Sequence, residues 1–309
     1  MSSMGDYFQR RRIAKRRMNE TLGDKIFNIF NFTFASIIFL AVLYPIVYVV
    51  SSSFSDPLAV IQGRVRLLPI GFNLEGYRSV FRHSQVVTGY LNSLWYMTVG
   101  TSLNIFFTIL AAYPLSRKDF YDRNKFMMVF AFTMLFSGGL IPTFLLVRSL
   151  GMLDTRWALV IPGGFSVFNV IVMRTFFQST LPDELLESAR IDGCTDFKFV
   201  TKIAIPLSGP IIAVQVLFYS LGHWNSFFAA LIYLSSPNLF PLQLVLRNIL
   251  LLGQWGEGMI DLEAEAHREW LAALMRYSLI VVSSLPFMLL YPFVQKFFVK
   301  GMLIGAIKG

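Results

Sequence analysis

Long apolar runs separated by short polar segments make up most of the chain. Six runs, at about 26–50, 91–115, 126–147, 157–177, 205–234 and 277–297, are each roughly 20 residues or longer. A helix of that length crosses a hydrocarbon core of ~30 Å. Away from their ends, the runs contain no Asp, Glu, Lys or Arg. The pattern predicts an all-α polytopic membrane protein with six transmembrane helices.

The start of the chain is strongly basic, with seven Lys and Arg in residues 1–25. A secretory signal peptide also begins with positive charge, but the apolar run that follows is too long for a signal core and has no small-residue cleavage pattern. We therefore expect 1–25 to be a basic tail, 26–50 to remain as the first span, and 26–309 to form a single transmembrane domain. No tandem repeat or low-complexity linker divides it.

The distribution of basic residues predicts the orientation in the membrane. If the N-terminus lies inside, the inner segments 1–25, 116–126, 174–204 and 296–309 hold eighteen of the 27 Lys and Arg. The outer segments 51–90, 148–156 and 235–276 hold the other nine. Because cytoplasmic loops are enriched in basic residues, both termini are predicted to be cytoplasmic.

Composition supports lipid as the solvent of this chain: 55% of its residues are hydrophobic, 16% are aromatic, and the mean hydropathy is +0.59. The net charge of +9 comes from basic residues beside apolar runs rather than from one basic face, so we expect no nucleic acid partner. Cys194 is the sole cysteine, which excludes an internal disulfide, and His83, His223 and His267 are too dispersed for a metal site.

The polar interruption at 184–210 reads as two short helices joined at a glycine. Thr180 is expected to cap the first helix, whose first turn holds Pro182, Asp183 and Glu184. Gly193 is expected to end that helix in the left-handed conformation. A second helix is expected to start at Thr195 and Asp196, with Pro206 and Pro210 stopping it. We call residues 180–210 the elbow.

The elbow resembles the EAA loop of bacterial ABC importer permeases. The positions that match its pattern are Glu187, Ala189, Asp192, Gly193, Pro206 and Pro210. Ser188 and Cys194 replace the usual alanines, and Val200 replaces a common phenylalanine, all with side chains of similar character. The resemblance implies a type I importer fold in which this loop docks into an ATPase subunit. It also implies that Glu187, Ser188, Ala189, Asp192, Gly193, Cys194 and Pro206 couple the two proteins.

The resemblance further implies the rest of the assembly: a second permease subunit, most simply in a heterodimer, two ABC ATPases that bind ATP and Mg²⁺, and an extracytoplasmic solute-binding protein. The resemblance covers about 90–298. Stretches such as Gly139–Leu153, Phe168–Phe177 and Trp224–Phe227 look like the carbohydrate-uptake branch, whose members include maltose-type second permeases and permeases for oligosaccharides or polysaccharide fragments. A carbohydrate substrate and a plasma-membrane location follow as expectations.

Polar residues inside the apolar runs are candidates for a translocation path, because an amide in hydrocarbon needs a partner or water. They are Asn104, Asn169, Gln215, His223, Trp224 and Asn225. In His223-Trp224-Asn225, the aromatic face of the tryptophan could stack on a sugar ring while the polar side chains bind its hydroxyl groups. Contacts that only join helices are an equally good interpretation of the same residues.

Other classes of function fit the sequence less well. The dipeptide Gly-Lys of a phosphate-binding loop is absent, so we expect no catalytic residues and no ATP hydrolysis in this chain. An ion-coupled secondary transporter would need ionisable groups inside its spans. A membrane-embedded glycosyltransferase or hydrolase would need convergent acids, and only the scattered acids of 257–269 could supply them. An ABC importer of another solute remains an alternative.

The two longer outer segments carry weaker signals. Tyr77, Val80 and Phe81 predict a short amphipathic helix before the second span. Residues 235–276 begin with a turn-rich stretch, and the later charges Glu263, Glu265, His267, Arg268 and Glu269 are typical of a solvated helix face. Contact between these segments and a substrate-delivering protein is the alternative.

Overall fold

The computed structural model describes residues 21–252, 270, 275–289, 291–292 and 295. The described residues are mostly helical and contain no strand. The chain divides into two compact units, Met1–Phe72 and Asn73–Gly309, which are described separately below. The acids of 257–269 and most of the basic tail lie outside the described residues.

The first unit is built on one long helix, α2 (Leu22–Ser53), followed by the short α3 (Pro57–Ile61). Thr21 and Asp24 cap α2 reciprocally: the Thr21 hydroxyl accepts from the Asp24 amide at 3.2 Å, and the Asp24 carboxylate accepts from the Thr21 amide at 3.0 Å. Beyond α2, the chain folds back on the helix end, where the Ser51 hydroxyl donates to the Leu67 carbonyl at 2.6 Å. The helix therefore has a defined start and a defined end.

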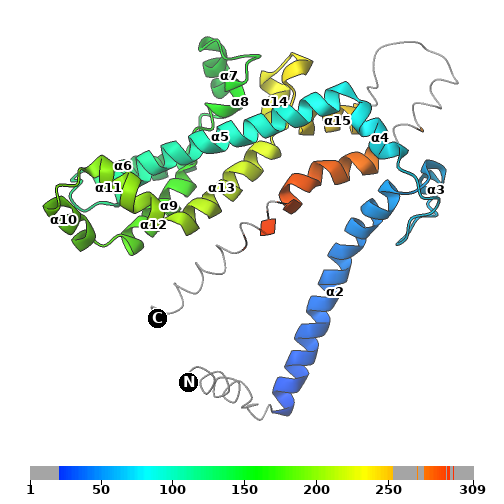
Figure 1. The fold of residues 1–309 in the computed structure, drawn as a ribbon, viewed down its shortest axis with the longest axis horizontal. Helices are drawn as coiled ribbons and strands as arrows, with labels where there is room; N and C mark the ends of the chain where they lie inside the picture. The colour runs from blue at the N-terminus through cyan, green and yellow to red at the C-terminus, as the bar shows by residue number, and fades with distance from the viewer. Residues whose placement is uncertain (1–20, 253–269, 271–274, 290, 293–294, 296–309) are drawn as a thin grey trace, which may run out of the picture. The chain divides into compact units, whose positions relative to one another are not determined.

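The second unit is organised around α5 (Ser84–Ser116), which is preceded by the amphipathic α4 (Glu75–Arg82). Figure 1 shows α5 running the length of this unit, with α10–α12 near one end and α4 and α15 near the other. The other elements are, in chain order, α6 (Arg123–Leu135), α7 (Leu140–Ser149), α8 (Trp157–Val160), α9 (Val167–Thr180), α10 (Asp183–Ile191), α11 (Asp196–Phe199), a π-helical turn (Val200–Ala204), α12 (Ile205–Leu207), α13 (Gly209–Trp224), α14 (Phe228–Tyr233), a 3₁₀ turn (Pro237–Leu239), α15 (Leu242–Leu252) and the helix Met275–Leu289.

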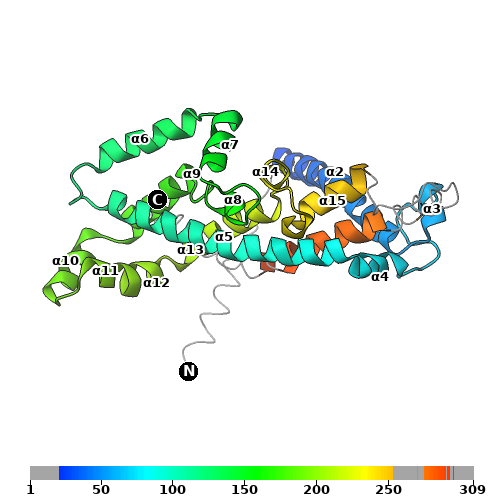
Figure 2. The same cartoon turned by 90° about the horizontal axis from the view of Figure 1, so that it is seen from above.

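Small residues on one face of α5 let its neighbours approach closely. Gly89, Ser93, Gly100, Thr108 and Ala112 recur at helical spacing and are buried. At Gly100, a Cβ atom would clash with the imidazole ring of His223 on α13, so any other residue would require that ring to move. Both views show α13 running beside α5 (Figures 1 and 2).

The apolar runs at 26–50 and 91–115 lie within single helices, α2 and α5, as predicted. These two are long and apolar enough to cross a membrane, and up to four spans result within the described residues if each of two bent helix pairs counts as one. The described part of the sixth run forms the helix Met275–Leu289. The amphipathic helix predicted around Val80 is confirmed as α4, with Val80 fully buried.

Three predicted spans are not single straight helices. The run at 126–147 bends by 111° between α6 and α7, where Gly139 has φ +81°. The run at 157–177 is interrupted around Pro162, Gly163 and Gly164, and α13 ends at Trp224 within the run at 205–234. Glycine and proline inside an apolar run keep its hydropathy high while they break its backbone, so hydropathy alone did not reveal the breaks.

Candidate functional site

The first helix of the elbow, α10, ends in a Schellman motif at Gly193, whose φ is +75°. The Gly193 amide donates to the Arg190 carbonyl at 3.0 Å, and the Cys194 amide donates to the Ala189 carbonyl at 2.9 Å. No atom lies within 4 Å of a Cβ placed on Gly193, so its requirement for glycine comes from the backbone conformation alone. The predicted left-handed turn is confirmed.

The second helix begins as predicted at Thr195, whose hydroxyl accepts from the Lys198 amide at 3.4 Å. Two other predictions about the elbow are wrong. Thr180 is the last residue of α9, and Pro182 occupies the cap position of α10, where its fixed φ suits an extended residue. The cap predicted at Thr180 therefore does not form.

Pro206 does not itself stop the second helix, which ends one residue later, before Pro210. The π-helical turn Val200–Ala204 precedes it, and α12 continues through Pro206 to Leu207. A π turn widens the backbone just where the proline ring would meet a carbonyl and where its missing N–H breaks the α pattern. The sharp change of direction comes at Ser208, where the axis turns by 82° into α13.

One side of the elbow is packed into a core under the end of α5. Leu186, Ala189, Phe199 and Ala204 are buried there with residues of α5 and α9. The ring centroids of Tyr113 and Phe199 lie 6.3 Å apart. Ala189 thus faces this core, and the elbow is fixed to α5 and α9 by apolar packing.

Other residues of the elbow are exposed and combine apolar and acidic groups. Ile191 is 87% exposed and Phe197 is 80% exposed, which is unusual for side chains of this size in water. Glu187, Ser188 and Asp192 are also exposed, as is Pro206, while Cys194 is half-buried. Large apolar groups rimmed by carboxylates are typical of a protein-binding surface.

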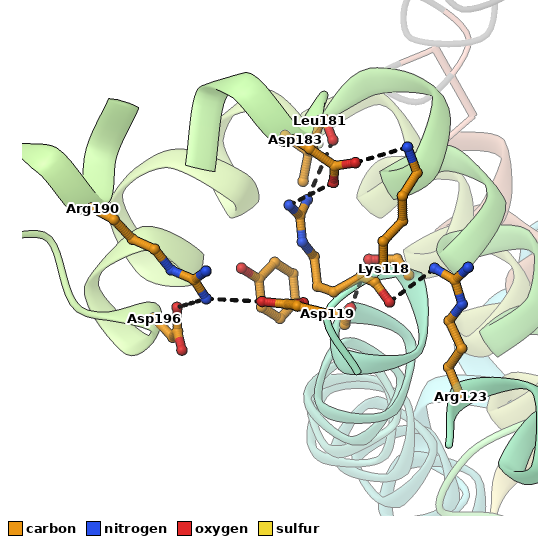
Figure 3. A network of polar contacts seen from close by, with 10 residues as sticks. Lys118, Asp119, Arg123, Leu181, Asp183, Arg190 and Asp196 are labelled. Carbon is orange, nitrogen blue, oxygen red and sulfur yellow. Dashed lines mark hydrogen bonds and ion pairs between the residues drawn. The ribbon is translucent and has the colours of Figure 1, made fainter. Parts of the chain in front are cut away.

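A set of ion pairs holds α10 against the loop that follows α5 (Figure 3). Asp183 at the start of α10 accepts from Arg117 at 2.8 Å and from Lys118 at 2.9 Å. The Arg117 side chain is only 8% exposed, and its guanidinium also donates to the Leu181 carbonyl at 3.4 Å. The hydrogen bond from Lys118 and the charges of Arg117 and Arg123 lower the pKa of Asp183 below its usual value.

Arg190 extends this network to the far end of α10. Its guanidinium lies 3.0 Å from the Asp119 carboxylate and 3.1 Å from the Asp196 carboxylate. It therefore joins the loop after α5 to both helices of the elbow, across the Gly193 turn (Figure 3). We call Arg117, Lys118, Asp119, Asp183 and Arg190 the clamp.

No local pattern in the sequence predicts the clamp. Arg117 and Lys118 were counted only as topology signals, and Asp183 only as an acid in a first helical turn. Arg117 and Asp183 are 66 positions apart, and no local pattern connects residues at that distance. The clustering of opposite charges in two inner segments was the one available signal.

Most of the candidate path residues engage other parts of the chain. Asn104 on α5 lies 2.6 Å from His223 Nε2 through its Oδ1, and its Nδ2 donates to the Gly163 carbonyl at 2.5 Å. The buried Gln215 donates from Nε2 to the Asn169 carbonyl at 3.2 Å. These contacts join α5 and α13 to the interrupted stretch between α8 and α9 and to α9 itself.

Trp224 and its neighbour Asn225 differ in exposure. The Trp224 indole is 2% exposed, donates to the Ser283 carbonyl at 3.1 Å, and makes edge contacts with Tyr90 and Phe287. Its ring faces are therefore covered in this conformation. Asn225 is exposed, with its Nδ2 donating to the Leu221 carbonyl at 3.0 Å, and its amide oxygen is left for other partners.

Comparisons with known proteins identify relatives along almost the whole chain, although no protein-family model matches it. The chain is 39% identical over 297 residues to protein LplC of Bacillus subtilis (strain 168), covering 94% of this chain and 98% of the relative. It is 38% identical over 286 residues to the polygalacturonan/rhamnogalacturonan transport system permease protein YtcP of the same organism, covering 93% and 99%.

A solved structure is similar over the same length. A chain of a bacterial ABC transporter involved in the import of the acidic polysaccharide alginate matches with a TM-score of 0.81 and 34% identity. The match covers 90% of this chain and 98% of that chain.

Proposed function

The chain belongs to the permease subunits of ATP-driven ABC importers for carbohydrates, and from this premise we propose that its elbow is the contact with an ATPase partner. In this proposal the importer carries an oligosaccharide across the plasma membrane by alternating access. Two ATPase subunits hold ATP and Mg²⁺, and a second permease and an extracytoplasmic binding protein complete the assembly. Six spans, with both termini in the cytoplasm, put the elbow on the ATPase side.

The single observation that carries the coupling role is the contrast between the buried and the exposed residues of the elbow. The buried residues pack against α5 and α9, and the clamp ties α10 to the loop after α5, while Ile191, Phe197 and Glu187 are exposed. A partner that moves the exposed residues must also move α5 and α9, since the connection is packed and ion-paired. The elbow thereby acts as a lever between the ATPase and the helices that line the path.

Alternating access requires a binding partner to prefer one conformation of the permease over the other. ATP-driven closure of the ATPases supplies that preference in this scheme. The spans then alternate between outward-open and inward-open states, and His223, Asn169, Trp224 and Asn225 are the proposed path residues. Contacts such as Asn104 with His223 are expected to be exchanged between the states.

We call the exposed residues Glu187, Ile191 and Phe197 the docking surface, and Glu187→Ala tests it. We expect the complex purified in mild detergent from its native membrane to contain a phosphate-binding-loop ATPase. Loss of the Glu187 carboxylate should lower the yield of that ATPase and its hydrolysis about tenfold, because a charge-assisted contact across an interface is lost. Copurified subunits, identified by mass spectrometry, and ATPase activity are the two measurements.

Glu184→Ala is the matched control, since Glu184 lies on the same helix and is also exposed. It should leave both measurements close to the wild type. A chain that purifies alone, or an ATPase retained equally by the wild type and Glu187→Ala, would contradict the docking role of Glu187.

A further inference from the structure

Two tryptophans and an arginine meet where the N-terminal half of α5 approaches the start of α8. The Arg156 guanidinium lies over the Trp95 ring, 5.0 Å from its centroid, and donates to Asn92 Oδ1 at 3.1 Å. Trp95 and Trp157 pack edge to face with their centroids 5.9 Å apart. The positive charge of Arg156 therefore lies over Trp95, which in turn packs against Trp157.

No carboxylate forms an ion pair with Arg156 within the part of the chain that the structure describes. Asp154 is two residues away, but its Oδ1 accepts from the amides of Ser235 at 2.9 Å and Ser236 at 2.8 Å. Its Oδ2 accepts from the Ser236 hydroxyl at 2.5 Å. A guanidinium has five N–H donors, and one hydrogen bond from Arg156, to Asn92, forms among the residues that the structure describes.

Asn92 fixes the position of Arg156. Its side chain is 3% exposed, and its Nδ2 donates to the carbonyls of Asn238 at 2.7 Å and Phe240 at 3.1 Å. The neighbouring Ser93 hydroxyl accepts from the Leu242 amide at 2.8 Å. Oδ1 of Asn92 is thus held toward Arg156 by a rigid junction of α5 with the segment before α15, which orients the guanidinium in advance of any ligand.

The location of the cluster suits the entrance of a transport path. Trp95 lies about 30 Å along α5 from its end at Ser116, given the rise of a helix, which is the thickness of the hydrocarbon core. In the proposed orientation Trp95 therefore lies at the outer surface of the plasma membrane. Trp157 is 46% exposed.

We infer that Arg156 and Trp157 form a subsite for a uronic acid unit of the transported oligosaccharide. The apolar face of the sugar ring stacks on the Trp157 indole, and its carboxylate accepts from the Arg156 guanidinium in the bidentate geometry that this pair favours. A lipid phosphate would also pair with the guanidinium, but a lipid headgroup has no sugar ring that could stack on the Trp157 indole. This inference rests on the proposed function and adds to it that the substrate is acidic.

Calorimetric titration of the purified importer, without its binding protein, tests the subsite. The probes are trigalacturonate and its neutral, carboxyl-reduced counterpart trigalactose. Arg156→Gln should weaken trigalacturonate binding about tenfold, as expected for the loss of a charge-assisted contact, and should leave trigalactose binding unchanged. Arg148→Gln removes an exposed charge from the nearby helix α7 and should change neither titration.

The inference is overturned if Arg156→Gln binds trigalacturonate as tightly as the wild type, or if the substitution weakens both sugars equally. Displacement of trigalacturonate by short-chain phosphatidylglycerol would also overturn it, since the arginine would then serve a lipid. ATP-driven uptake into proteoliposomes separates the two proposals. If the wild type shows ATP-driven uptake but Arg156→Gln binds trigalacturonate normally, the subsite alone is rejected. If no ATP-driven oligosaccharide uptake occurs, the proposed function is rejected and the subsite with it.

Discussion

Replacing Gly193 with valine should reduce ATP-driven uptake about tenfold or more while the complex still assembles in the membrane. Gly193 has φ +75°, and a β-branched residue in that region is strained by about 1–2 kcal/mol. The space around the residue is open, so the change acts through the backbone and not through a clash. Relief of the strain would open the Schellman motif and alter the angle between α10 and α11.

The altered angle separates the two parts of the docking surface, because Glu187 and Ile191 lie before the turn and Phe197 lies after it. We expect uptake and the stimulation of ATP hydrolysis by the binding protein to fall about tenfold or more. Gly193→Asn is the matched control, since asparagine tolerates the left-handed conformation, and it should retain most of both activities. Normal uptake by Gly193→Val would show that the turn has no part in coupling.

Asp183→Asn should both destabilise the permease and reduce coupling. The substitution leaves the buried guanidinium of Arg117 without its carboxylate, and it removes the exposed pair with Lys118 as well. Since Asp183 itself is partly exposed, we expect a cost of about 1–3 kcal/mol, below that of a fully buried pair. Thermal unfolding of the purified complex and ATP-driven uptake are the measurements.

Glu184→Gln makes the same change of charge one residue later, on an exposed side chain without an ion pair in the described structure, and should have little effect. The pH dependence gives a second readout. Because the pKa of Asp183 is lowered in the folded state, its contribution is present above the unfolded pKa of about 3.9 and is lost as the pH falls through the folded value. Equal unfolding temperatures of the two variants at neutral pH would contradict the clamp.

How much of this molecule could be predicted depended on whether the signal was local. The runs at 26–50 and 91–115 give continuous helices, because nothing inside them interrupts the backbone beyond what a helix tolerates. The Gly193 turn and the Thr195 cap were also predictable, since each depends on the conformational preference of one residue and its near neighbours.

Competition between local signals explains the errors. Thr180 is a good capping residue, but its position at the end of α9 leaves Pro182 to start α10. Pro206 is a strong helix breaker, yet the π turn before it accommodates its ring. Each outcome was decided by the course of the chain on both sides, which residue preferences alone do not determine.

Contacts between distant residues could not be predicted at all. The clamp joins the end of α5 to α10, and the cluster at Arg156 joins α5 to the start of α8. These two sites lie toward opposite ends of the same helix. The small residues along α5 determine where its neighbouring helices pack, and this packing brings the distant residues of each site together. It leaves no pairing pattern in the sequence.

Cross-linking from Cys194 shows whether the elbow touches an ATPase subunit, because this single cysteine lies in the elbow beside Gly193. A photoactivatable maleimide is attached to Cys194 in native membranes. After irradiation, the cross-linked adduct is identified by mass spectrometry, with Cys194→Ser as the control for labelling elsewhere. We expect an adduct with an ATPase subunit that is lost in the control and changes in yield when ATP is added. Adducts with lipid alone, under conditions in which the ATPase copurifies, would contradict the elbow as the site of coupling.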